Sequence, residues 1–236
     1  MNDNYHLLGK GVYSIQDAMA FSGLSFARVR HWIRGDKRSG KFGRKENSPI
    51  ICLQHGIING VYTLGFLDLV ELLMISKINE EGISVRAIRS MHDNAQNWLE
   101  KSHPFAYYKI YTAGIDLIIK LSDDSGDEFL LNMRNNNIEL KDVTEPYLKD
   151  IDFSNEEKEI ALRWWPFGRD KSVVIDPNRF RGHPIVAKRG VSTLVLAESV
   201  KAEGSIRKAA HWYQVDETEV RDAYDFETII TKRVAA

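Results

Sequence analysis

The first apolar residues of the chain recur at helical spacing on both sides of a glycine. Ser14 can cap a short helix, because its hydroxyl can accept a hydrogen bond from the first turn. Gly23 permits a tight turn, and Ser25 can cap a second helix. The core-facing positions of the two helices are Ile15, Ala18, Met19, Phe21, Phe26, Val29, Trp32 and Ile33. This pattern predicts a helix-turn-helix.

A basic, glycine-bearing segment follows at 35–47 and precedes two short apolar stretches. Residues 50–53 and 60–64 have the composition of strands, with a turn between them at 56–60. Two short strands around a basic loop predict a wing. Flexible lysines and arginines in a wing would reach DNA phosphates and add affinity that depends on salt but not on sequence.

Two longer amphipathic helices come next. The stretch Phe66–Asn79 has apolar residues at helical spacing, and we expect Asp68, Glu71 and Glu80 to face solvent. Ser84 can cap the following helix. The core-facing positions of that helix are Val85, Ile88, Met91, Ala95, Trp98 and Leu99. We interpret both apolar stripes as packing surfaces rather than as a cofactor site.

The middle of the chain predicts short strands and turns. Within 103–121, residues 107–111 and 115–121 flank a Thr-Ala-Gly turn and are rich in aromatic and β-branched residues, which predicts a hairpin. The acids at 123–127 lack EF-hand spacing, so we interpret them as an acidic turn rather than a calcium loop. The three asparagines at 135–137 predict another turn.

Helices return in the C-terminal part of the chain. A helix over Thr193–Glu203 stops at a glycine, and a serine can cap the next helix, Ile206–Tyr213. A last helix runs from Glu217 to about Ile229. We expect only Thr231–Ala236 to be tail-like.

Together these elements predict an α+β chain in three parts. They are an N-terminal winged helix-turn-helix over 1–102, an acidic connecting region with a β-hairpin over 103–160, and a small helical, helix-turn-helix-like domain over 161–236. The charges also divide the chain: Arg28–Lys45 holds eight Lys and Arg against one acid, whereas Asp116–Glu159 holds thirteen acids against five bases. A local net charge of +7 attracts polyanions although the whole chain carries only −1.

The composition is that of a globular protein, with 236 residues, 43% of them hydrophobic and 28% charged. No apolar run reaches about 18 residues, so we expect no membrane-spanning helix and no membrane partner. The N-terminus lacks the pattern of a signal peptide. The single cysteine, Cys52, lies between Ile51 and Leu53, so we expect a buried structural thiol in a reducing cytoplasm.

Catalytic motifs are missing from the sequence. The seven histidines show no zinc-binding spacing, and no phosphate-binding loop or nucleophile elbow occurs. The acids of 116–159 do not single out a carboxylate pair, so we interpret them as a solvated surface. We therefore expect no enzyme, no catalytic residue, no metal and no cofactor.

The outward side of the second helix is cationic. Arg28, His31 and Arg34 lie there, with Arg30 beside them. A solvated helix face is one interpretation, and DNA binding is the other, because guanidinium groups can fork onto guanine edges or clamp phosphates. The basic segment that follows the helix favours DNA.

The order of these pieces resembles the MerR-like winged helix-turn-helix over about the first 100 residues. The residues that carry the resemblance are the Gly23 turn, the arginine-rich helix ending at Trp32, the wing, and the stretches 66–71 and 81–89. In that family the second helix enters the major groove and the wing contacts phosphates. The resemblance implies that the reading residues are Arg28, Arg30, His31 and Arg34, and that the wing contacts are Arg38, Lys41, Arg44 and Lys45.

Two features depart from that family. The wing region here is long, and the chain has neither the dimerising coiled coil nor the sensor cysteines of effector-sensing members. The second departure argues against a metal or redox sensor.

A second resemblance covers roughly Val173–Phe226. This region resembles a small helical domain of Vap-type antitoxins, formerly of unknown function. The residues that carry the resemblance are Gly182-His183-Pro184, the turn at 189–191, the glycine stop followed by a serine cap, and 220–224. Their usual partner is a PIN-like ribonuclease toxin, and a MerR-like domain before this module is a known arrangement. Members often read Gly-Thr-Arg where this chain has Ala-Lys-Arg at 187–189.

These observations lead to two hypotheses. The first is a DNA-binding antitoxin of a type II pair, which represses its own operon on double-stranded operator DNA, neutralises a PIN-like toxin and acts as a homodimer. The second is a stand-alone MerR-like transcriptional regulator whose C-terminal domain dimerises or binds a ligand. A small PIN-like protein encoded by the neighbouring reading frame would favour the first.

Overall fold

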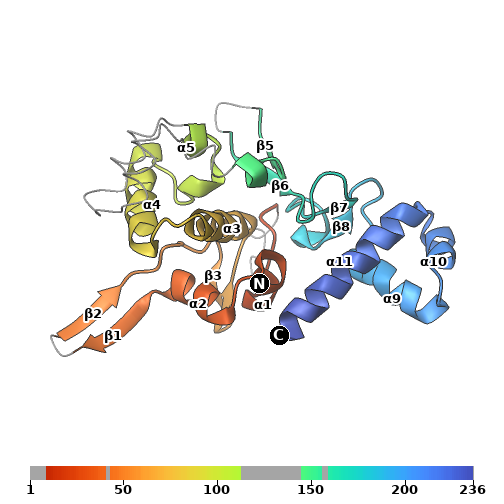
Figure 1. Cartoon of the computed structure of the whole chain (residues 1–236), viewed down its shortest axis with the longest axis horizontal. Coiled ribbons are helices and arrows are strands. Elements are labelled where there is room, and N and C mark those ends of the chain that lie inside the picture. The colour runs from red at the N-terminus through yellow and green to blue at the C-terminus, as the bar shows by residue number, and fades with distance from the viewer. Residues whose placement is uncertain (1–8, 41–42, 113–144, 156–158, 236) are drawn as a thin grey trace, which may run out of the picture.

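The structure is a computed structural model that describes residues 9–40, 43–112, 145–155 and 159–235. Helices alternate with short antiparallel strand pairs, so the predicted α+β class is confirmed (Figure 1). None of the helices in these ranges is long and apolar enough to cross a membrane. The elements are α1 (Ile15–Ser22), α2 (Phe26–Arg34), β1 (Asp36–Gly40), β2 (Gly43–Asn47), β3 (Gly56–Ile58), β4 (Val61–Thr63), α3 (Phe66–Glu80), α4 (Val85–Leu99), η2 (Pro104–Ala106), α5 (Lys109–Thr112), β5 (Ile151–Phe153), β6 (Ala161–Trp164), β7 (Val173–Val174), η3 (Phe180–Gly182), β8 (Ile185–Val186), α9 (Thr193–Glu203), α10 (Ile206–Tyr213) and α11 (Glu217–Ala235).

The basic segment itself forms a hairpin, in which β1 pairs antiparallel with β2. The second predicted wing strand is present as β4, but it pairs with β3, and the predicted strand at 50–53 is wrong. The backbone N–H groups of Ile50 and Ile51 both donate to the carbonyl of Trp32, at 2.8 and 3.2 Å. Both isoleucine side chains are buried, and these two hydrogen bonds satisfy their backbone N–H groups. The segment is therefore tied to the end of α2 instead of to a neighbouring strand.

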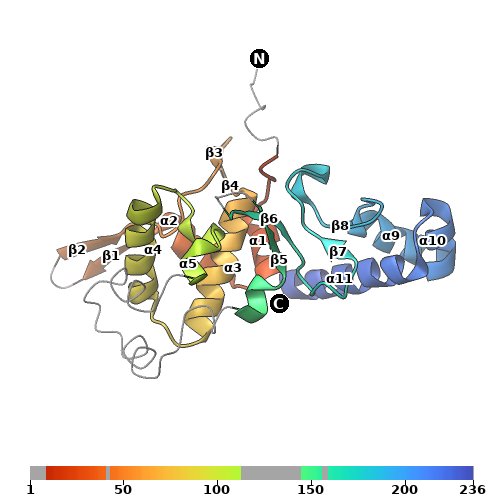
Figure 2. The same ribbon diagram turned by 90° about the horizontal axis from the view of Figure 1, so that it is seen from above.

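Helix α3 lies at the centre of the larger hydrophobic core (Figures 1 and 2). It is buried on nearly every side, so the expectation that Asp68 and Glu71 face solvent is wrong: both are fully buried. Ile88, Met91 and Ala95 of α4 are buried as predicted. Trp98 is instead 40% exposed, with the Lys109 ammonium 5.2 Å from its ring centre.

The predicted strand at 107–111 is wrong. Residues 104–106 form η2 and 109–112 form α5, while Tyr107 makes only an isolated bridge with Ile160. The buried Tyr111 hydroxyl donates to the carbonyl of Phe105 at 2.6 Å, and this contact closes the segment into a compact turn. The other predictions for this region, at 115–121, 123–127 and 135–137, lie outside the described residues.

The last three helices pack around a smaller apolar cluster, formed by Val186, Leu196, Ala209, Ala210, Val215, Val220 and Ala223. The predicted bounds of α9 and α10 are confirmed. Helix α11 continues to Ala235, so the expectation that the chain is tail-like from Thr231 is wrong for residues 231–235. Its C-terminal end lies beside α1, where Arg233 donates to the carbonyls of Ala20 and Phe21 at 3.1 and 3.3 Å (Figures 1 and 2).

Candidate nucleic-acid interface

Local capping positions α1 and α2. The Ser14 hydroxyl accepts from the Asp17 N–H, and the Asp17 carboxylate accepts from the Ser14 N–H at 2.8 Å, which completes a capping box. Gly23 ends α1 at a φ of 73°, a left-handed conformation that glycine adopts without steric cost. The Ser25 hydroxyl then caps α2. The predicted helix pair is therefore present with its predicted caps.

Helix α2 has one buried side and one cationic side. Val29, Trp32 and Ile33 are buried as predicted, whereas Phe26 is 46% exposed and its predicted place in the core is wrong. On the other side Arg28, Arg30 and Arg34 are exposed, and His31 is partly buried. The structure thus brings the four candidate residues of this helix onto one short element.

Two neighbours modify this cationic face. The Arg34 guanidinium lies over the ring of Tyr62 in β4, 5.2 Å from its centre, and this contact was missed in the sequence because the residues are far apart in the chain. Burial would raise the pKa of Glu80, but hydrogen bonds from Lys77 and Ser76 and the charges of Lys77 and Arg28 lower it. Glu80 therefore remains an anion close to Arg28.

The basic hairpin leaves α2 directly. Gly35, at a φ of 69°, ends the helix and turns the chain into β1. In the register of the hairpin Arg38 lies opposite Lys45, and Ser39 lies opposite Arg44. Lys41 lies outside the described residues. Figure 1 shows the hairpin projecting beyond α2, away from the rest of the molecule.

The base of the hairpin is held by contacts from three helices. The Arg89 guanidinium of α4 donates to the carbonyl of Ser48. Ile50 and Ile51 donate to the end of α2, as described above. Three residues beyond Ile51, the Gln54 N–H donates to the Asp68 carboxylate of α3, at 3.0 and 3.2 Å to its two oxygens. Cys52, within this segment, is exposed, so the prediction of a buried thiol is wrong.

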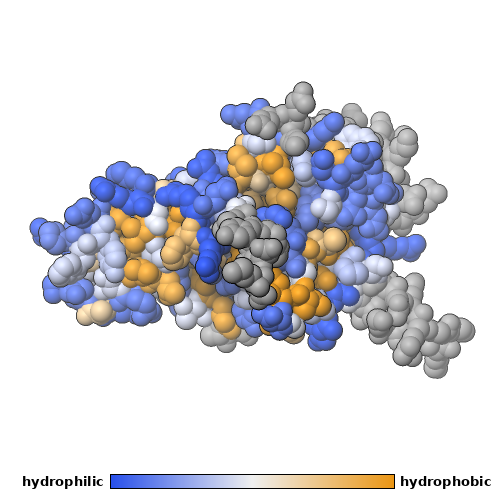
Figure 3. Space-filling view, turned by 180° about the vertical axis from the view of Figure 1, so that it is seen from behind, coloured by the Kyte–Doolittle hydropathy of each residue, from blue (hydrophilic) through white to orange (hydrophobic). Residues whose placement is uncertain are grey.

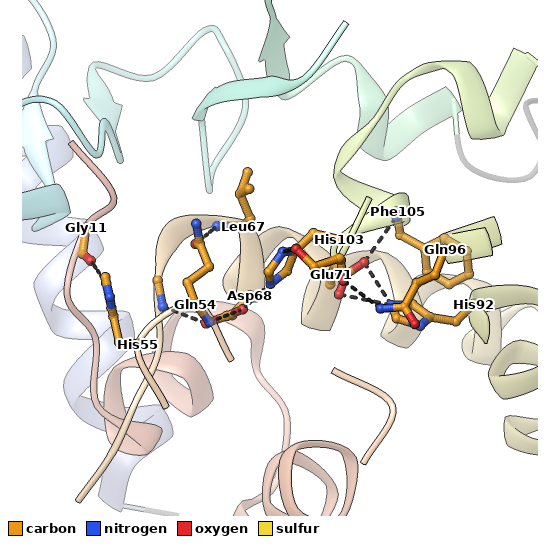
Figure 4. Close-up of polar contacts among 12 residues, drawn as sticks. Gly11, Gln54, His55, Leu67, Asp68, Glu71, His92, Gln96, His103 and Phe105 are labelled. Carbon is orange, nitrogen blue, oxygen red and sulfur yellow. Dashed lines mark hydrogen bonds and ion pairs between the residues drawn. The ribbon is translucent and has the colours of Figure 1, made fainter. Parts of the chain in front are cut away.

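A row of buried polar contacts extends from this point through the core (Figure 4). Besides Gln54, Asp68 accepts from the Gly65 N–H at 2.7 Å and pairs with His103 Nε2 at 2.6 Å. One turn along α3, Glu71 pairs with His92 Nε2 at 3.0 Å and accepts from the Phe105 N–H at 3.1 Å. Each carboxylate therefore joins α3 to other segments of the chain.

The burial of these groups decides their role. Burial lowers the pKa of His103, but its hydrogen bond to Asp68 and the charges of Glu71 and Asp68 outweigh that effect and raise it above its ordinary value. Both carboxylates are fully buried and already accept several hydrogen bonds, so the cluster braces the fold. Among the residues that the structure describes, no group of three or more His, Cys, Asp or Glu is arranged to hold a metal ion.

Known proteins similar to this chain include a curated relative and a solved structure. No protein-family model matches the chain. The chain is 24% identical over 226 residues to a protein of Mycobacterium tuberculosis (strain ATCC 25618 / H37Rv) named "Putative antitoxin VapB45", an alignment that covers 91% of this chain and 92% of that protein. The crystal structure of Rv2018 from Mycobacterium tuberculosis is similar with a TM-score of 0.67 and 20% identity, covering 89% of this chain and 96% of that one. The chain therefore shares the fold of Rv2018 over nearly its whole length.

Proposed function

We propose that this protein is a DNA-binding antitoxin of a type II toxin–antitoxin pair. The observation that carries the proposal is the sequence similarity to the VapB45 protein, because it extends over nine-tenths of both chains and thus includes the basic N-terminal part and the helical C-terminal part alike. The antitoxin would repress its own operon and neutralise a PIN-like ribonuclease toxin.

The DNA-binding part of the proposal rests on α2 and the hairpin, which would act together as a MerR-like winged helix-turn-helix. Arg28, Arg30, His31 and Arg34 would enter the major groove, where arginine can bind guanine through two hydrogen bonds. The hairpin residues Arg38, Lys41, Arg44 and Lys45 would contact phosphates on the flank. A homodimer would present two such units to paired half-sites about one helical turn apart.

A binding titration on the DNA upstream of the gene tests this proposal, with a scrambled duplex of the same length as reference. We expect selective binding to the upstream DNA. The logarithm of the association constant should fall with the logarithm of the salt concentration with a slope of about −5, as for six neutralised phosphates. The double variant Arg28→Glu, Arg34→Glu should lose the preference for the upstream DNA.

The matched control reverses two arginines elsewhere, Arg163→Glu and Arg207→Glu, which are 45% and 87% exposed and lie on β6 and α10. If the wild type binds both duplexes equally, or if the control loses as much affinity as the α2 variant, DNA reading by α2 is refuted. The toxin is tested separately: co-expression with the product of the adjacent reading frame should abolish that product's growth inhibition and ribonuclease activity.

A further inference from the structure

A groove of about 560 Å³ lies between α1, the η3 turn, the start of α9 and the second half of α11. Its lining includes Phe21, Phe180, Leu194, Val195 and Ile230, and none of the residues proposed to bind DNA. Figure 3 shows the molecule from behind, with apolar side chains gathered on the part that α9, α10 and α11 form. The groove is thus an apolar surface separate from the basic one.

One wall of the groove is a strained turn held in place by the N-terminal segment. Phe180, Arg181 and Gly182 are three consecutive residues with positive φ, at 47°, 56° and 84°. Such a conformation is costly for the first two, and it persists only where surrounding contacts enforce it. Here the Val12 N–H donates to the Arg181 carbonyl at 3.1 Å, and the Tyr13 hydroxyl donates to the Gly182 carbonyl at 3.0 Å.

The consequence of this strain is a rigidly presented apolar patch. Phe180 is 57% exposed, and Leu194 and Val195, which line the same groove from the start of α9, are 56% and 40% exposed. Large apolar side chains gathered at an exposed groove mark interaction sites, and an aromatic residue beside an arginine is the composition typical of binding hot spots. Because the turn is already rigid, a partner would pay little entropy to order it.

The polar groups of the groove specify the charge of the partner. Asp17 already accepts from the backbone and the hydroxyl of Ser14, at 2.8 and 2.7 Å. Glu227 accepts from the Thr193 hydroxyl, and burial raises its pKa. In contrast, the exposed Arg181 guanidinium makes no hydrogen bond or ion pair within the described part of the chain. Of these three charged side chains, Arg181 is exposed whereas Asp17 and Glu227 are partly buried, so the charge that the groove presents to a partner is positive.

We propose that this groove docks the protein partner of the chain, the toxin of the proposed function, through a segment that carries an apolar side chain next to Asp or Glu. The apolar side chain would lie between Phe180 and Leu194, and the carboxylate would pair with Arg181. A second copy of the chain fits less well, because a two-fold contact needs a self-complementary patch and a concave groove with a cationic rim is not complementary to itself.

The test measures the dissociation constant between the purified full-length chain and the purified product of the adjacent reading frame, by calorimetry. We expect Leu194→Asp and Arg181→Glu each to weaken binding at least about tenfold. Leu194 is in the first turn of α9, where an aspartate is compatible with the helix, so the variant should remain folded. The matched controls are Leu162→Asp on β6 and Arg207→Glu on α10, both exposed, which should stay within about twofold of the wild type.

The outcomes separate this inference from the function on which it rests. If the wild type does not bind the product, the toxin partner is wrong and the docking proposal falls with it. If the wild type binds and the two groove variants bind equally well, only the docking proposal is overturned. If those variants instead dissociate a dimer in sedimentation equilibrium, a second copy occupies the groove and the proposal is again overturned.

Discussion

Asp68 links three separate parts of the chain through one carboxylate. It accepts from the backbone at Gly65 and Gln54 and pairs with His103, so the start of α3, the segment after the hairpin and the segment after α4 meet at a single side chain. A buried charge is tolerated because these partners replace its hydration. The position of the basic hairpin thus depends on a residue in the core.

Replacing Asp68 by alanine should cost about 3–5 kcal/mol of unfolding free energy, because it leaves the buried Gly65 N–H, the partly buried Gln54 N–H and His103 without their acceptor. Glu80→Ala on the same helix is the control: the side chains of Glu80 and its ion-pair partner Lys77 are 45% and 23% exposed, and the loss of this pair should cost about 1 kcal/mol. Urea denaturation of the three proteins measures the difference. Similar losses for both variants would contradict the bracing role of Asp68.

His103 predicts a dependence of stability on pH. Its pKa in the folded protein is raised above the unfolded value, so the folded state binds the proton more tightly. The stabilisation is fully present below about pH 6.5 and is lost as the pH rises through the folded pKa. Between about pH 6 and pH 9 the unfolding free energy should therefore fall in the wild type and fall less in His103→Gln.

The control for that experiment is His211→Gln, because His211 is an exposed histidine of α10. This variant should keep the wild-type pH profile, measured by urea denaturation at each pH. A His103→Gln profile parallel to that of the wild type would refute the assignment.

At the scale of elements, the short helices could be predicted because their signals are local. Ser14, Ser25, Ser84 and Ser205 accept hydrogen bonds from the first turns that they were expected to cap. The β propensity of 107–111 predicts a strand, but two hydrogen bonds override that propensity: the Phe105 N–H donates to Glu71, 34 residues away, and the Tyr111 hydroxyl donates to the Phe105 carbonyl. The burial of Asp68 and Glu71 was missed because their histidine partners lie 21 to 35 residues away.

The hairpin and α2 should differ in what they contribute to DNA binding. Neutralising the hairpin, with Arg38, Arg44 and Lys45 each changed to alanine, should make the salt slope shallower by up to about 3 and leave the preference for the upstream DNA intact. The comparison is the α2 double variant, which should lose that preference. Titrations on both duplexes at several salt concentrations measure both quantities, and a loss of preference on neutralising the hairpin would contradict this division.

At the scale of the whole molecule, the two ends of the chain are joined by a contact that no local pattern could predict. Arg233 lies 213 residues from Ala20 in the sequence, yet its guanidinium binds the last carbonyls of α1 and lies 6.0 Å from the ring centre of Phe167. A cation at a helix C-terminus is favourable, because the free carbonyls there carry partial negative charge. Helix α11 thereby fastens the C-terminal helices to the first helix of the proposed DNA-binding part.

Arg233→Ala should therefore lower the unfolding free energy by about 1 kcal/mol, because the Arg233 side chain is exposed and only its hydrogen bonds to Ala20 and Phe21 are partly buried. It should also speed hydrogen exchange at the end of α11 and in the last turn of α1, because both lose the same anchor. Lys232→Ala is the control, since this neighbouring residue of α11 is exposed and should change neither quantity. Unchanged exchange in α1 of the Arg233 variant would mean that packing around Phe226, and not this contact, holds the two parts together.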